Sequence, residues 1–135
     1  MPEPKLPPPV CLAMVLCDHV WTDPSTGKKT LIGTFSTLNA SSLPVTNPEL
    51  EVYACLTEGH GKNSIRLRIS DVDDVWPPVF EAREEIGFPH PQAIHEVVFS
   101  IRNLVFQHPG DYRVQLFVKD EFIIERRLAV TLAKN

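Results

Sequence analysis

The sequence lacks the features that mark several large classes of protein. It has three cysteines in 135 residues, an odd number that cannot form a complete disulfide framework. It has no excess of positive charge, because 17 acidic residues against 13 basic ones give a formal net charge of -4. This balance provides no electrostatic footprint for nucleic acid or for an anionic membrane, so we expect neither as a partner.

A long apolar run is also missing. The apolar stretch from Val10 to Leu16 is too short to span a bilayer, and the prolines, Glu3 and single Lys5 before it do not resemble the basic start of a signal peptide. Cys11 and Cys17 fall in one expected strand, about 20 Å apart at roughly 3.3 Å per residue, whereas a disulfide needs Cα atoms within about 7 Å. We therefore expect free, buried thiols and a cytoplasmic protein.

Helical periodicity is absent, and 13 prolines disfavour long helices because an interior proline removes a backbone donor. Apolar residues instead recur at every second position, which is typical of half-buried strands. We predict strands over residues 10–18, 29–36, 50–57, 64–70, 80–88, 95–101, 112–119 and 122–132, with a short helix over 92–98 as an alternative to the sixth. The pattern predicts an all-β fold, an antiparallel β-sandwich of about eight strands with immunoglobulin-like architecture, in one domain over 10–135 after a flexible proline-rich tail over 1–9.

Two strands have irregular patterns. The first is apolar on both faces, so we expect its outer side to be covered, either by the irregular connection at 38–48 or by another copy of the chain. The last strand changes phase along its length. Either a bulge near Glu125 and Arg126 corrects the phase, or the strand is regular, with Phe122 and Ile124 inward and Arg126 extending at the end of the sheet.

Tyr112 opens a strand directly after the turn residues Pro109, Gly110 and Asp111. We expect it to be a core tyrosine whose hydroxyl finds a backbone partner. A tyrosine in this position resembles the tyrosine corner of immunoglobulin-like sandwiches, but no cysteine follows two residues later. The resemblance therefore concerns architecture and does not extend to true antibody domains.

Four sequence segments together resemble a bacterial family of small uncharacterised single-domain proteins. They are the stretch from Cys11 to Trp21 with its Asp18-His19, the turn from Glu58 to Lys62, Arg66-Leu67-Arg68, and the start of the last hairpin from Pro109 to Tyr112. The resemblance covers about residues 10 to 132. It implies a β-sandwich without an assigned activity, and it supplies no catalytic or ligand-binding residue.

Three polar features are candidates for a small enzyme or for a ligand-binding or metal-binding site: His19, His60 and the loop from Asp71 to Asp74. Asp18 could orient the imidazole of His19, with Cys17 beside them as a thiol nucleophile. Adjacent strand residues point to opposite faces, however, so Cys17, Asp18 and His19 cannot all converge without a bulge. No two ligands show the short spacing of structural zinc sites, and the acidic loop lacks a glycine to fold it around calcium. We therefore expect no catalytic residue, no metal and no cofactor.

Large apolar groups without an evident inward role are the more informative feature. Trp21, Trp76, Phe117 and Val15, the last on the outer face of the first strand, are candidate interface residues, because exposed apolar patches often mark partner sites. The alternative is that loops fold back over them. We expect a non-enzymatic binding or assembly module that acts through protein-protein contacts, with a protein partner or with itself.

Overall fold

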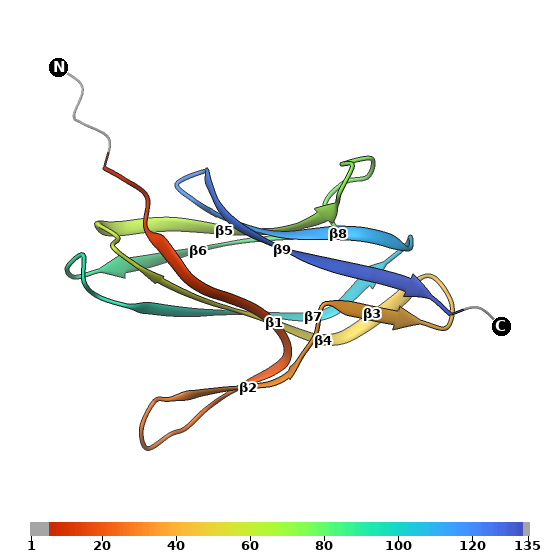
Figure 1. Cartoon of the computed structure of the whole chain (residues 1–135), viewed down its shortest axis with the longest axis horizontal. Helices are drawn as coiled ribbons and strands as arrows, with labels where there is room; N and C mark the ends of the chain where they lie inside the picture. Colours follow the sequence, from red (N-terminus) through yellow and green to blue (C-terminus); the bar gives the residue numbers. More distant parts are fainter. Residues whose placement is uncertain (1–5, 134–135) are drawn as a thin grey trace.

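The computed structural model describes residues 6–133, and every regular element among them is a β-strand (Figure 1). The all-β prediction is confirmed. The nine strands are β1 (Val10–Thr22), β2 (Lys29–Thr34), β3 (Thr37–Ala40), β4 (Val45–Thr57), β5 (Gly61–Asp71), β6 (Phe80–Phe88), β7 (His95–Phe106), β8 (Gly110–Val118) and β9 (Glu121–Leu132). The helix alternative for 92–98 is wrong, because β7 occupies most of that segment. The predicted tail falls partly on residues 1–5, which lie outside the described residues.

The strands form two sheets, one in the order β2-β1-β4-β7 and the other in the order β3-β9-β8-β5-β6. Adjacent strands run antiparallel, except that β3 runs parallel to β9. β3 is the strand that the sequence pattern missed, because its four residues lie in a polar stretch without period. It crosses to the second sheet, where the Thr131 hydroxyl donates a hydrogen bond to the Asn39 side chain.

Apolar side chains from both sheets pack into one cluster between them, as the two-residue period predicts. Val52 of β4 and Leu67 of β5 are fully buried there, one from each sheet. Leu104 and Phe106 close the cluster at the end of β7. None of the residues 6–133 forms a helix of the length and hydropathy needed to cross a bilayer.

A bulge at Leu12 changes which side chains of β1 face inward. Cys11 pairs with Leu56 and Ala13 pairs with Cys55, so Leu12 is the extra residue. Cys11 consequently packs against the core, while Leu12 is exposed. The outer side of β1 is covered only in part, since Cys17 is fully buried and Val15 half-buried. The segment 38–48 does not provide the predicted cover, because β3 within it pairs with β9 of the other sheet and the start of β4 pairs with β7.

The phase change in β9 is also produced by a bulge, but at a different residue from the one predicted. Leu116 pairs with Ile124 and Phe117 pairs with Phe122, so Ile123 is the extra residue rather than Glu125 or Arg126. Ile124 packs against the core, as the regular-strand alternative predicted, whereas Phe122 is exposed. Arg126 reaches across to the other sheet, where its Nε donates a 3.0 Å hydrogen bond to the Met14 carbonyl.

β5 connects two opposite ends of the molecule. It begins at Gly61, just after His60, and ends at Asp71, just before the loop that carries Trp76. Its 11 residues span about 33 Å at roughly 3.3 Å per residue. We call these two ends the His60 end and the Trp76 end; in Figure 1 they are joined by the yellow-green ribbon of β5.

Candidate binding site

At the Trp76 end, the loop between β5 and β6 is held by the carboxylate of Asp71. Asp71 is 9% exposed, and its two oxygens accept hydrogen bonds from the backbone amides of Val75 at 2.8 Å and Trp76 at 3.2 Å. Burial acts to raise the pKa of Asp71, but these amide bonds outweigh it and hold the pKa below its ordinary value. The ionised carboxylate therefore fixes the backbone that presents Trp76.

The indole of Trp76 stacks on the imidazole of His108, with ring centroids 3.7 Å apart and an angle of 11° between the planes. His108 is fixed in turn, because the Tyr112 hydroxyl donates a 2.6 Å hydrogen bond to its carbonyl. The predicted backbone partner of Tyr112 is thus confirmed. Burial and the nearby charge of Asp71 raise the pKa of the Tyr112 hydroxyl, so it remains a donor at neutral pH. The Tyr112 ring packs edge-on against Phe106 in the core.

These side chains line a pocket of about 290 Å³, which is close to the smallest volumes typical of ligand sites. We call it the Trp76 pocket. Its wall consists mainly of aromatic and proline rings and contains few polar groups. The residues that form the wall include Trp76, Pro77, Pro78, Val105, His108 and Tyr112. Trp76 was predicted as an interface residue, but the pocket was not predicted. The available signal was the grouping of Trp76-Pro77-Pro78 in one loop and His108-Pro109 in another.

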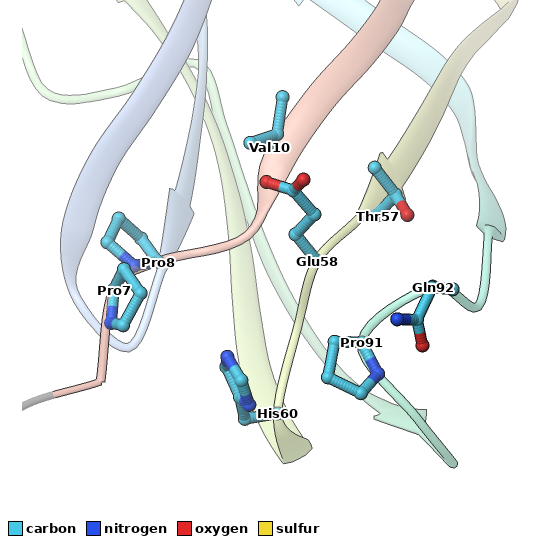
Figure 2. A pocket seen from close by; sticks show the side chains of 8 residues that line it. All are labelled: Pro7, Pro8, Val10, Thr57, Glu58, His60, Pro91 and Gln92. Carbon is cyan, nitrogen blue, oxygen red and sulfur yellow. The ribbon is translucent and has the colours of Figure 1, made fainter.

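A second depression, at the His60 end, has a volume of about 570 Å³. Figure 2 shows Pro7 and Pro8 on one side of it and Pro91 on another, with His60 between them. The depression is therefore walled partly by the chain's own N-terminal segment. Pro9 is buried, whereas Pro7 and Pro8 are exposed.

A polar cluster lies where β1 separates from β4. Glu51, whose side chain is 7% exposed, accepts hydrogen bonds from the Val20 amide at 2.7 Å and from the Ser100 hydroxyl. His19 Nδ1 lies 2.9 Å from Glu51 and 3.4 Å from Glu49. Burial acts to raise the pKa of Glu51, but the bonds from Ser100 and Val20 and the contact with His19 outweigh it, so the pKa lies below its ordinary value.

The imidazole and the two carboxylates place three possible metal-ligand atoms within 4.8 Å of one another. The geometry nevertheless accounts for this cluster as a structural one. The pairing of β1 with β4 ends at Cys17 and Glu51, so beyond that point the Val20 amide needs a new acceptor. The carboxylate of Glu51 supplies it, and thereby fixes the start of the β1-β2 hairpin.

The four candidate interface residues lie in separate places. Trp21 is 46% exposed on the β1-β2 hairpin, and Val15 is half-buried on β1. Phe117 lies on the outer face of the other sheet, where the guanidinium of Arg66 covers its ring at 4.1 Å and Phe122 meets it edge-on. Val15 lines a depression beside Phe35 and Arg126, whereas Trp76 lines a pocket with the rings of His108 and Tyr112.

The candidate polar groups do not converge either. His60 and Asp71 lie at opposite ends of β5, while His19 is in the other sheet. Asp71 is occupied by the backbone of its own loop, and Asp74 faces the Arg68 guanidinium at 3.3 Å. Cys17 next to His19 is fully buried, and burial followed by the charge of Glu51 raises the pKa of its thiol. An activated thiol requires the opposite shift.

Solved structures resemble this chain in fold. The C-terminal domain of wzt is 12% identical with a TM-score of 0.58, and the match covers 93% of this chain and 75% of that one. A β-glucosidase from Listeria innocua in complex with glucose is 21% identical with a TM-score of 0.49, and the match covers 71% of this chain and 15% of the enzyme. This chain thus corresponds to a small part of the glucosidase, and the likeness does not extend to activity.

No curated protein matches the sequence. One protein-family model does, over residues 12–131, which include all of β2 to β8 and nearly all of β1 and β9. The chain therefore belongs to DUF6941, a family of unknown function.

Proposed function

We propose that the protein is a non-enzymatic binding module that recognises another polypeptide through the Trp76 pocket. In this proposal it is an immunoglobulin-like β-sandwich of a bacterial cytoplasm, and the hydroxyl of Tyr112 bonded to the carbonyl four residues earlier supports that architecture. Three unpaired cysteines support a reducing compartment.

The observation that carries the proposal is the stacked pair of Trp76 and His108 in a pocket walled by rings. Trp76 is 44% exposed although it is a large apolar group, and its backbone is fixed by Asp71. A fixed, partly exposed aromatic side chain loses little conformational entropy on binding, which is why such residues dominate interfaces. Rings of tryptophan, tyrosine and proline also form the grooves that receive extended, proline-containing segments.

The positions of the ionisable groups support a role without catalysis. Nucleophilic catalysis usually pairs a nucleophile with a base within hydrogen-bond reach, and acid-base catalysis needs an ionisable group that is free to reach the substrate. His60 and the Asp71 loop are separated by the length of β5, and the carboxylate of Glu51 already accepts bonds from Val20 and Ser100. The second candidate, a small enzyme or metal-binding protein, would have to use His19, Glu49 and Glu51.

Fluorescence titration tests the proposal, because the chain has two tryptophans. Trp21→Phe leaves Trp76 as the sole indole, and a short polyproline peptide is the probe. We expect a saturable change in Trp76 emission, and its loss when His108→Ala removes the stacking partner.

Calorimetric titration of two matched tryptophan variants with the same peptide provides the control. Trp76→Ala is expected to abolish peptide binding and Trp21→Ala to preserve it, since the two indoles are almost equally exposed, at 44% and 46%. If the peptide produces no saturable signal, or if both variants bind it equally well, the pocket is not a peptide site and the proposal fails.

A further inference from the structure

The chain contains a proline-rich segment of the kind that the Trp76 pocket would receive. Residues 1–9 read Met-Pro-Glu-Pro-Lys-Leu-Pro-Pro-Pro, with prolines three apart at Pro4 and Pro7. Prolines at this spacing favour the extended polyproline conformation, which has three residues per turn and so brings both rings to one side. A sequence with this preference loses little entropy on binding to an aromatic groove.

This segment cannot reach the pocket of its own molecule. Pro9 is buried just before Val10, and Val10 pairs with Thr57 at the His60 end. From Pro9 to Pro2 the chain covers at most about 25 Å even when fully extended. The Trp76 pocket lies beyond Asp71 at the far end of β5, about 33 Å away by strand length. An occupant with this sequence must therefore come from another molecule.

The charges of the two partners are compatible. The segment carries Glu3 between Pro2 and Pro4, and Lys5 between Pro4 and Pro7. The loop beside the pocket carries Asp71, Asp73 and Asp74. Asp74 is paired with Arg68, but Asp73 is exposed, and the hydrogen bonds to Asp71 come from the amides of its own loop, which leaves the loop with a negative charge. A lysine that projects between two docked prolines would meet that charge.

We propose that the Trp76 pocket binds the segment Pro2 to Pro7 of a second copy of this chain, so that copies associate through segment and pocket. This inference rests on the proposed function and names the polypeptide that the pocket receives. Because the donor segment and the acceptor pocket are different surfaces, the contact is heterologous, and repeated use links copies into rings or open chains.

Light scattering during size-exclusion chromatography tests the inference with two variants that keep the folded body intact. One lacks residues 1–6 and keeps the pocket; the other carries Trp76→Ala and keeps the segment. The wild-type chain is expected to associate as its concentration rises, and each variant alone to remain monomeric. When mixed, the two variants are expected to form a 1:1 heterodimer that grows no further, because only one segment and one pocket remain. Trp21→Ala is the matched control and should associate as the wild type does.

A synthetic peptide of residues 1–9 separates this inference from the proposed function. We expect it to bind the variant lacking residues 1–6, and Lys5→Glu in the peptide to weaken binding about tenfold. If polyproline binds and this peptide does not, the inference falls and the proposed function stands. If neither binds, both fall. A wild-type chain that stays monomeric at every concentration, or variants that associate unchanged, also overturn the inference.

Discussion

Replacement of Glu51 is expected to destabilise the β1-β2 hairpin. The side chain of Glu51 is 7% exposed and accepts hydrogen bonds from the Val20 amide and the Ser100 hydroxyl, beside the His19 imidazole. The buried Val20 amide has no β4 carbonyl opposite it, because the pairing of the two strands ends at Cys17 and Glu51. Truncation to alanine would leave this donor without a partner.

The magnitude follows from these three contacts. A hydrogen bond between a charged group and a buried amide contributes about 1.5 to 3 kcal/mol. The Ser100 bond adds less, because Ser100 is exposed and can bond to water, and His19, at 50% exposure, adds at most about 1 kcal/mol after screening. We expect Glu51→Ala to lower the free energy of unfolding by about 3 kcal/mol. Glu51→Gln keeps an acceptor without the charge and should cost about 1 kcal/mol.

Urea unfolding at several pH values provides the assay, with Trp21 fluorescence in a Trp76→Phe background as the probe of the hairpin. The pKa of Glu51 is lower in the folded chain than its ordinary value. Its charge therefore stabilises the fold fully above the unfolded pKa of about 4.3, and this stabilisation disappears as pH falls through the folded pKa. The difference between wild type and Glu51→Gln should shrink on acidification. A difference that is absent at pH 7, or that grows in acid, would refute this role for Glu51.

Two further substitutions test the packing at the two ends. Tyr112→Phe is expected to lower the free energy of unfolding by about 1 kcal/mol through loss of the bond to the His108 carbonyl, and an unchanged urea midpoint would contradict this. Gly59→Ala is expected to cost about 1 to 3 kcal/mol, because the added Cβ would overlap the Phe88 ring. Gly87→Ala is its control, because a Cβ there meets no atom within 4 Å, and it should change the free energy of unfolding by less than about 0.5 kcal/mol. Equal losses of stability in the two variants would contradict the predicted overlap with Phe88.

Most of the fold was predictable because the two-residue period is a local property. The strands around Leu67 and Val114 follow from alternation alone, and both residues are fully buried. β3 was not predictable, because a strand of four residues in a polar stretch gains its pairing from β9, about 90 residues later in the chain. Bulges at Leu12 and Ile123 were difficult for a related reason: the register of the partner strand decides which residue is extra.

The candidate site was predictable only in part. Trp76 stands out in the sequence as a large apolar residue in a loop, but its partner His108 lies 32 positions further on and meets it only through the fold. Phe117 gave a similar signal, yet Arg66 of the neighbouring strand covers its ring. The amino-acid sequence alone does not distinguish an exposed aromatic residue from one that a long polar side chain of a neighbouring strand covers.

The most direct test of the central claim is a proton-nitrogen correlation spectrum of the wild-type chain during titration with the peptide of residues 1–9. The two indole N–H signals, from Trp76 and Trp21, report on the pocket and on the hairpin within one sample. We predict that the Trp76 signal shifts progressively and saturates while the Trp21 signal stays in place. A Trp76 signal that does not move, or two signals that move together, would contradict binding at the Trp76 pocket.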